Sequence, residues 1–522
     1  MKIKEEIYRC RQLHQHSLPK KVGKVDTKQI KNMKGICTIP ILCILLLMFS
    51  FFTLTAQTNG KYSEEVESKI RQVEQNLASW VVIENMPKWN LQERMNFYKI
   101  KGISVAIIKN YKIEWARGYG WADSAENIPV TTSTLFQAAS ISKSLNALGM
   151  LKLAQNNSID INTDINTYLS SWKFPYDSVS NGKKITISNL LSHTGGISIS
   201  GFDGYTKIDS IPNIIQILNG KKPANSDAVK SIFEPNLKYT YSGGGTTISQ
   251  LIIEEVSGKN YADFMESNVL KPIGMQNSFY TNTTSKIKLR LLATGYNGEK
   301  EVAMKYHIYP EKAAAGLWTN PTELAKYVIE IQKSLLGKSN KILNQEFTKL
   351  MLTPYVDNSS ALGVFIEDRQ GTKYFRHGGV NEGFTSLYFG SVENGYGAVV
   401  MCNSTDKTIL YEILNSVASV YKWENFYTPT SKKVIKIEPG ELSKYVGKYT
   451  SDGREYIISQ DKGNLFLELI GQKWQIYFTS ATDFFMYQAP GIDHQFIFDN
   501  NRIQAFNIKL KAGRNIVVKK IE

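Results

Sequence analysis

The chain has 522 residues and a formal net charge of +15, with 42% hydrophobic and 21% charged residues. This length exceeds that of one ordinary domain, and the hydrophobic content excludes a wholly disordered chain. The charge does not indicate a nucleic-acid partner, because residues 1–56 supply +7 of it and the other +8 is scattered, without a basic stripe interleaved with aromatic residues.

The strongest change in composition lies near the N-terminus. Ile36 to Phe52 is almost continuously apolar, follows a basic stretch and precedes a few small residues. This order is typical of a secretory signal, and the apolar run is also close to the length of a membrane anchor. We predict a basic leader at 1–34 and a signal peptide or membrane anchor at 35–56, with Met33 as a candidate for the true start. The rest of the chain is then exported across the inner membrane to the periplasm or cell envelope, anchored by residues 36–56 if they are not cleaved.

The cysteines indicate neither a disulfide framework nor a metal site. Cys10, Cys37 and Cys43 precede the expected cleavage point near Ala56, and only Cys402 follows it. One cysteine cannot form an internal disulfide, and no Cys/His spacing typical of metal binding is present. We therefore expect no metal and no cofactor.

Helical and strand periodicities alternate over residues 62–427. We predict a helix from Glu64 to Trp80, a β-hairpin over 102–116 and a helix from Ser140 to Gln155. Further helices are predicted at 185–191, 246–256, 261–270, 321–335 and 409–421, and further strands at 374–377, 384–389 and 398–402. Because the strands come from both ends of this region, we predict an α+β domain with an antiparallel sheet flanked by helices.

The period changes to two after a predicted linker at 428–440, which contains Pro429 and Pro439-Gly440. Short strands separated by turn residues are predicted at 454–459, 465–469, 474–478, 484–486, 495–498, 503–510 and 515–519. This spacing predicts a small antiparallel β-barrel over residues 441–522.

The first candidate catalytic pair is Ser140 and Lys143. Residues i and i+3 share one face of a helix, so the amine can reach the hydroxyl. Serine becomes a nucleophile when a base removes its proton, and a lysine partly withdrawn from water can have a pKa low enough to do so. Taken alone, the quartet also fits an ordinary surface serine and lysine.

The second candidate is Tyr241, which stands before Ser242 and Gly243 in a glycine-rich segment. A phenol near a lysine ammonium is favoured as the phenolate, and it can then shuttle protons. The alternative is a turn with a half-buried tyrosine.

The third candidate segment is His377-Gly378-Gly379-Val380, at the end of a predicted strand. The two glycines would let a substrate lie flat against the strand edge. The N–H of Val380, with that of Ser140, would form an oxyanion hole, and His377 would add a polar donor. The alternative is a β-turn that carries a hydrogen-bonded histidine.

In this order the three motifs resemble those of the penicillin-recognising serine hydrolases, in particular the branch of class C β-lactamases, DD-peptidases and esterases. The resemblance spans about residues 70–425 and includes Leu190–Gly196, in which His193 is expected to be a hydrogen-bonded loop residue. The segment from Tyr445 is similar to a lipocalin-like β-domain. The resemblance implies a β-lactamase/transpeptidase-like fold and an acyl-enzyme on Ser140. It leaves open whether Lys143 or Tyr241 is the base in acylation.

Two departures from that family bear on the substrate. Gly243 stands where the second motif ordinarily has Asn, and His377 stands where the lactamases carry Lys. Both changes disfavour a β-lactamase and favour ester or amide substrates of the D-amino-acid peptide kind. The alternative is a catalytically slow penicillin-binding or sensor module. We expect a small-molecule or short-peptide substrate, no nucleic-acid partner and membrane contact only through the N-terminal segment, and the oligomeric state stays open.

Overall fold

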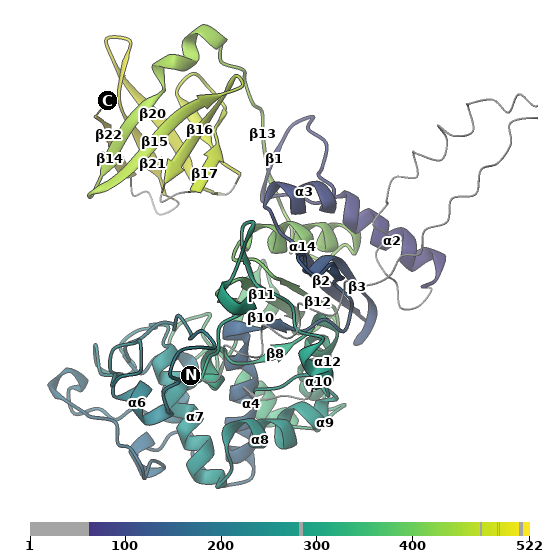
Figure 1. Cartoon of the computed structure of the whole chain (residues 1–522), viewed down its shortest axis with the longest axis vertical. Helices are drawn as coiled ribbons and strands as arrows, with labels where there is room; N and C mark the ends of the chain where they lie inside the picture. Colours follow the sequence, from purple (N-terminus) through teal and green to yellow (C-terminus); the bar gives the residue numbers. More distant parts are fainter. Residues whose placement is uncertain are drawn as a thin grey trace, which may run out of the picture. The chain divides into compact units, whose positions relative to one another are not determined.

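The computed structural model describes residues 62–280, 286–469, 472–487, 489, 491–510 and 515–521 (Figure 1). The predicted leader and the predicted signal peptide or anchor lie outside the described residues. Within the described part, no helix is long and apolar enough to cross a membrane.

A seven-stranded antiparallel sheet forms the centre of the first domain, with the strand order β4-β3-β2-β12-β11-β10-β9. Its strands are β2 (Gly102–Lys109), β3 (Lys112–Asp123), β4 (Ile128–Pro129), β9 (Phe365–Arg369), β10 (Thr372–Asn381), β11 (Phe384–Ser391) and β12 (Gly397–Cys402). The pairing of β2 with β12 joins the two ends of the domain in the middle of the sheet. The predicted α+β class with an antiparallel sheet is therefore confirmed.

Helices cover both faces of this sheet. Helix α12 (Pro321–Leu335) packs on β2, β3, β11 and β12, whereas α14 (Thr408–Val420) packs on β12 together with α2 (Glu64–Gln75) (Figure 1). The central strands β2, β11 and β12 are buried on both faces, which explains why β2 and β12 are almost continuously apolar rather than alternating.

The other elements before residue 427 lie outside this sheet. They are β1 (Val81–Ile83), α3 (Leu91–Phe97), β5 (Phe136–Gln137), α4 (Ser142–Gln155), α5 (Ile187–Ser192), α6 (Ile214–Leu218), α7 (Gly243–Ser257), α8 (Tyr261–Met265), α9 (Lys271–Ile273), α10 (Lys286–Leu289), β6 (Tyr296–Asn297), β7 (Lys300–Glu301), α11 (Lys312–Ala315), β8 (Trp318–Thr319) and α13 (Gln345–Met351).

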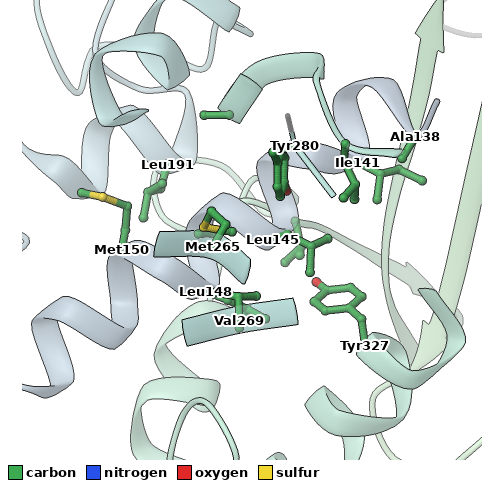
Figure 2. Close-up of a cluster of buried hydrophobic side chains, with 14 of the residues drawn as sticks. Ala138, Ile141, Leu145, Leu148, Met150, Leu191, Met265, Val269, Tyr280 and Tyr327 are labelled. Atoms are coloured by element: carbon green, nitrogen blue, oxygen red, sulfur yellow. The ribbon is translucent and has the colours of Figure 1, made fainter. Parts of the chain in front are cut away.

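Helix α4 is buried on all sides within this region. Figure 2 shows Leu145 and Leu148 among side chains from other elements, including Met265, Val269 and Tyr327, and all five side chains are fully buried. Burying a Leu or Met side chain stabilises a fold by about 1.5–3 kcal/mol. The helix that follows Ser140 is thus held rigidly by its own core.

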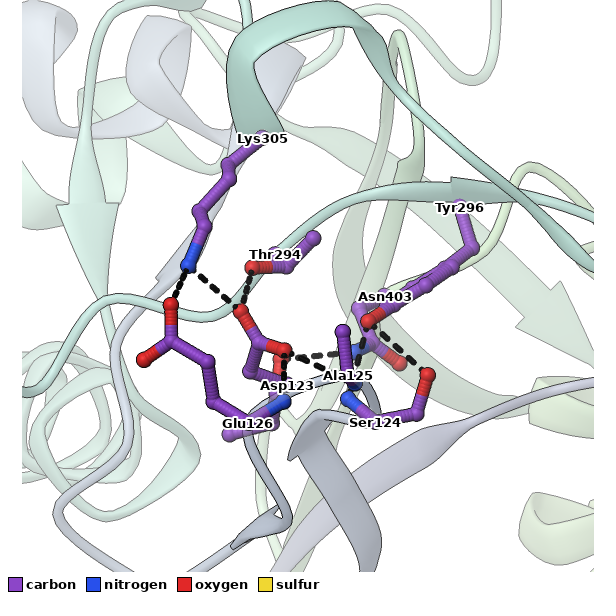
Figure 3. Close-up of polar contacts among 9 residues, drawn as sticks. Asp123, Ser124, Ala125, Glu126, Thr294, Tyr296, Lys305 and Asn403 are labelled. Atoms are coloured by element: carbon purple, nitrogen blue, oxygen red, sulfur yellow. Dashed lines mark hydrogen bonds and ion pairs between the residues drawn. The ribbon is translucent and has the colours of Figure 1, made fainter.

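A polar network fixes the end of β3 (Figure 3). The buried carboxylate of Asp123 accepts hydrogen bonds from Thr294 Oγ1 at 2.7 Å, from Lys305 Nζ at 2.8 Å and from the N–H groups of Ala125 and Glu126. Burial alone would raise the pKa of Asp123, but these donors outweigh it and the pKa is lowered. The network ties the strand to the segment that contains Thr294 and Lys305.

The C-terminal strands form a nine-stranded antiparallel sheet that is nearly closed into a barrel, with the order β17-β16-β15-β14-β22-β21-β20-β19-β18. These strands are β14 (Gly447–Ser451), β15 (Arg454–Asp461), β16 (Asn464–Leu469), β17 (Gln472–Gln475), β18 (Tyr477–Phe478), β19 (Asp483–Phe485), β20 (Asp493–Asp499), β21 (Arg502–Lys509) and β22 (Asn515–Lys520). Aromatic side chains such as Tyr449, Phe484 and Phe506 fill its core. The predicted antiparallel barrel is confirmed.

The structure differs from the predicted elements in several places. The first helix ends at Gln75 rather than at Trp80, because the backbone of Leu77 pairs with that of Trp89. The predicted helix 261–270 is α8 followed by a π-helical turn, and the predicted strand 474–478 is divided at Ile476. The predicted linker contains β13 (Thr430–Lys432), which pairs with β1, and strand β9 was not predicted.

Candidate active site

Ser140 lies in a 3-10 turn between β5 and α4, two residues before the helix begins at Ser142 rather than at its first residue. The residue before it, Ala139, has φ of +50° and is fully buried. A left-handed conformation at a non-glycine residue is unfavourable and persists only where the surrounding packing imposes it. The sharp turn presents the Ser140 hydroxyl at the end of β5.

Lys143 lies within reach of this hydroxyl. Its Nζ donates hydrogen bonds to Ser140 Oγ at 3.2 Å and to the carbonyl oxygen of Ala314 at 2.7 Å. The residue is only 3% exposed, and burial lowers the pKa of its amine to about 7. Near neutral pH a large fraction of this amine is therefore unprotonated and able to accept a proton.

Tyr241 completes the polar group around Ser140. Its ring centroid lies 5.0 Å from Lys143 Nζ, and it lines the same pocket as Ser140. Burial raises the pKa of Tyr241 to about 12, although the nearby Ser140 hydroxyl opposes the rise. The expected stabilisation of the phenolate is therefore not found, because desolvation of the buried phenol dominates its pKa.

Strand β10 approaches the nucleophile at Gly379. A Cβ atom at this position would lie 2.2 Å from the Ala138 carbonyl oxygen and 2.8 Å from the Ser140 nitrogen, so only glycine fits. The pairing of β9 with β10 ends at the pair Phe365–Arg376, so within the described part of the chain residues 377–380 have no strand partner on that side. An extended substrate can lie along this free edge, beside Ser140.

His377 is oriented differently from the prediction. Its Nδ1 lies 2.6 Å from the carbonyl oxygen of Gly378, and because a carbonyl only accepts, Nδ1 carries the proton. Nε2 is then an acceptor, and it has no hydrogen-bond partner among the described residues. Burial, followed by the charge of Lys143, lowers the pKa of His377 to about 3, so the ring stays neutral. The predicted polar donor is instead an acceptor.

A pocket of about 400 Å³ opens between these elements. Its lining includes Ser140, Tyr241, His377, Gly378, Gly379, Val380, Phe365, Arg376 and Lys407. The structure thus gathers most of the predicted site residues. Gly243 does not line the pocket, and a Cβ atom there would lie 3.1 Å from the Phe202 ring, which occupies the adjacent space.

Three further residues at the site were not singled out for it from the sequence. Ala314 fixes Lys143 through its carbonyl oxygen, Phe365 packs against the His377 ring at 5.2 Å, and His193 lies 4.4 Å from the Tyr241 ring. Ala314 and Phe365 act through a backbone atom and an apolar ring, so their residue types carry no signal of chemistry. Among the described residues, no three His, Cys, Asp or Glu side chains are grouped closely enough to hold a metal ion.

Comparisons with known proteins agree with this geometry. The family described as Beta-lactamase matches residues 89–412. Protein flp of Staphylococcus aureus (strain N315) is 26% identical over 334 residues, which cover 61% of this chain and 63% of that protein. Penicillin-binding protein 4* of Bacillus subtilis (strain 168) is 23% identical over 429 residues, covering 76% of this chain and 89% of that protein.

A solved structure gives the same fold. D-amino acid amidase from Ochrobactrum anthropi SV3, in complex with L-phenylalanine, superposes with a TM-score of 0.54 and 20% identity, covering 69% of this chain and 98% of that chain. The chain therefore spans somewhat less than two thirds of the Staphylococcus relative and nearly all of the amidase.

Proposed function

From the premise that this chain belongs to the Beta-lactamase family, which matches more than half of its residues, we propose that it is a serine hydrolase that forms an acyl-enzyme on Ser140. The observation that carries the proposal is the buried amine of Lys143, 3.2 Å from the Ser140 hydroxyl and with a pKa near 7. A base whose pKa lies close to the working pH is the most effective one for activating a hydroxyl.

In the proposed reaction, Ser140 Oγ bonds to the substrate carbonyl carbon while its proton passes to the neutral amine of Lys143. The bond between Lys143 and the Ala314 carbonyl orients the amine. The N–H groups of Ser140 and Val380 stabilise the oxyanion. As the intermediate collapses, the leaving group departs with a proton supplied through Lys143 and Tyr241. Water then attacks the acyl-enzyme and releases Ser140.

We propose an ester or an amide of the D-amino-acid kind as the substrate. A pocket of about 400 Å³ suits a small acyl group, and the neutral His377 lacks the charge that would hold a carboxylate. The names of two similar proteins, a penicillin-binding protein and a D-amino acid amidase, support the same class of substrate. The packing of Phe202 against Gly243 leaves little room for the amide side chain expected of a β-lactamase.

A substrate panel tests the proposal. We expect the wild type to hydrolyse p-nitrophenyl esters or D-amino-acid amides, and a fluorophosphonate probe to label Ser140. Ser140→Ala should abolish both, whereas Ser133→Ala, which alters an exposed serine before β5, should change neither. Persistent labelling of Ser140→Ala, or no turnover of any ester, amide or lactam, would reject the hydrolase.

The competing function is a binding or sensor module that acylates and then stalls. Two features favour this outcome: Ser242 caps α7 and fixes the backbone next to Tyr241, and Gly243 has no amide side chain to contact the substrate. Intact-mass spectrometry distinguishes the two, because a stalled module retains the acyl mass on Ser140 for hours whereas a hydrolase loses it within the turnover time.

We also propose that the hydrolase works in the cell envelope after export. The apolar run from Ile36 to Phe52 and its basic flank support this location. Cell fractionation followed by N-terminal sequencing tests it. A cytoplasmic protein that retains residues 1–56 would contradict it.

A further inference from the structure

The segment around Tyr241 is held by one residue, His193, on both sides. The main-chain carbonyl of His193 accepts the N–H of Thr240 at 2.8 Å, and its ring Nδ1 accepts the N–H of Ser242 at 3.2 Å. The imidazole also packs on the Tyr241 ring, with 4.4 Å between centroids. Tyr241 therefore lies between two residues whose main-chain N–H groups both donate hydrogen bonds to His193.

We propose that His193 is a positioning residue that sets the orientation of the Tyr241 hydroxyl towards Ser140. This inference deepens the proposed hydrolase function and rests on it. His193 does not act on the substrate itself, because it does not line the pocket and its Nδ1 is already occupied by the N–H of Ser242.

Local geometry shows why a histidine suits this position. His193 ends α5 with φ of +58°, and its N–H closes the helix by bonding to the Asn189 carbonyl. The left-handed turn aims the ring at Ser242 and Tyr241. Nδ1 can accept only while it carries no proton, and burial together with the charge of Lys143 holds the pKa of His193 well below its usual value. The ring remains a neutral acceptor over the working range of pH.

Ser242, which follows Tyr241 in the chain, is held in place as well. Ser242 caps α7 by accepting the N–H of Gly245 at 2.8 Å, and its hydroxyl donates to the carbonyl oxygen of Ser198 at 2.8 Å. Tyr241 therefore lies between a helix cap and the His193 ring. Loss of the ring removes one of these two constraints and leaves the other in place, so the tyrosine can swing while the helix stays formed.

A double-mutant cycle with Tyr241→Phe tests the inference. A displacement of about 1 Å costs a catalytic group roughly a hundredfold in rate. We therefore expect His193→Leu to lower kcat about a hundredfold with KM changed less than about threefold. In the Tyr241→Phe background, where no hydroxyl remains to be oriented, His193→Leu should lower kcat less than about twofold further. Additive losses, in which the double variant shows the product of the two single effects, would overturn the inference.

Two further variants separate positioning from simple loss of packing. His193→Asn retains a side-chain acceptor near Nδ1 and tolerates the left-handed backbone, so it should recover kcat to within about fivefold of wild type. Thr194→Val removes a buried hydroxyl that accepts a hydrogen bond from Asn189 of α5 but leaves the bonds to residues 240–242 intact. It should lower the Tm while leaving kcat within about threefold. A kcat loss for Thr194→Val as large as that for His193→Leu would overturn the inference.

The two proposals fail in distinguishable ways. Absence of turnover and of Ser140 labelling in the wild type rejects the hydrolase. In that case a crystal structure of His193→Leu still decides on positioning: a rotated Tyr241 ring supports it, and an unchanged ring overturns it. If His193→Leu does not fold, the cycle and the structure are repeated with His193→Gln, whose amide lies about one bond further along the side chain.

Discussion

The titration of Lys143 provides the sharpest test of which group is the base in acylation. An amine with a pKa of about 7 is about one tenth neutral at pH 6 and about nine tenths neutral at pH 8. If this amine accepts the Ser140 proton, kcat/KM should rise roughly tenfold between these values and then level off. A phenolate base at Tyr241, with its pKa of about 12, would instead give a rate that rises tenfold per pH unit up to pH 10 and beyond.

The assay is hydrolysis of one neutral ester from pH 5 to pH 10 at constant ionic strength, with kcat/KM extracted at each pH. Lys143→Arg is the matched variant, since a guanidinium keeps its proton throughout this range. It should lose activity by about 10²–10⁴-fold and show no inflection near pH 7. A wild-type profile that is flat from pH 5.5 to 8.5, or an inflection near 7 that survives in Lys143→Arg, would refute the assignment of Lys143 as the base.

Three other substitutions probe the frame of the site and the fold. Gly379→Ala should abolish ester hydrolysis, because its methyl group would overlap the backbone before Ser140. Gly378→Ala, whose Cβ would lie 3.5 Å from its nearest neighbour, should lose much less activity. Equal losses of activity would contradict the packing argument. Asp123→Asn should lower the free energy of unfolding by about 3 kcal/mol at pH 7. The lowered pKa of Asp123 makes this contribution complete above about pH 4 and lost as the pH falls through the lower folded value, so the variant should show a weaker acid dependence than wild type in urea titrations. Glu412→Ala should lower the free energy of unfolding by about 3–5 kcal/mol, since it leaves the buried guanidinium of Arg94 without its bidentate partner. The joint change Arg94→Met with Glu412→Leu should lower it markedly less. Chemical denaturation measures each value, and a single-variant cost below about 1 kcal/mol would contradict the reasoning.

Much of the fold was predictable because its apolar residues follow regular patterns. The sheet strands buried on both faces read as continuous apolar runs, and the barrel strands as short runs of period two. The end of the first helix was not predictable, because the pairing of Leu77 with Trp89 is a contact beyond the helix itself. Strand β9 contains Glu367, Asp368 and Arg369, so its composition resembles a surface loop, and its pairing with β10 decides its conformation.

The predicted site differs from the structure chiefly in its electrostatics. Residue types and spacing were enough to select Ser140, Lys143 and Tyr241. They could not give the pKa of Tyr241, which depends on how deeply the phenol is buried, nor the proton position on His377, which depends on a single carbonyl 2.6 Å away. The pKa of Tyr241 depends on side chains distant in sequence that bury it, and the proton position on His377 depends on the local path of the backbone at Gly378. The supporting role of His193 likewise depends on two amides near residue 241.

The central pairing of β2 with β12 has a consequence for how the protein is made. Ala106 of β2 and Val399 of β12 are partners, so the ribosome must add about 290 residues after Ala106 before these two strands can pair. Contacts between such distant segments slow folding, since the loop between them must be ordered first. The middle of the sheet can therefore form only after β12 has been synthesised, so the sheet whose strand β10 borders Ser140 is completed late.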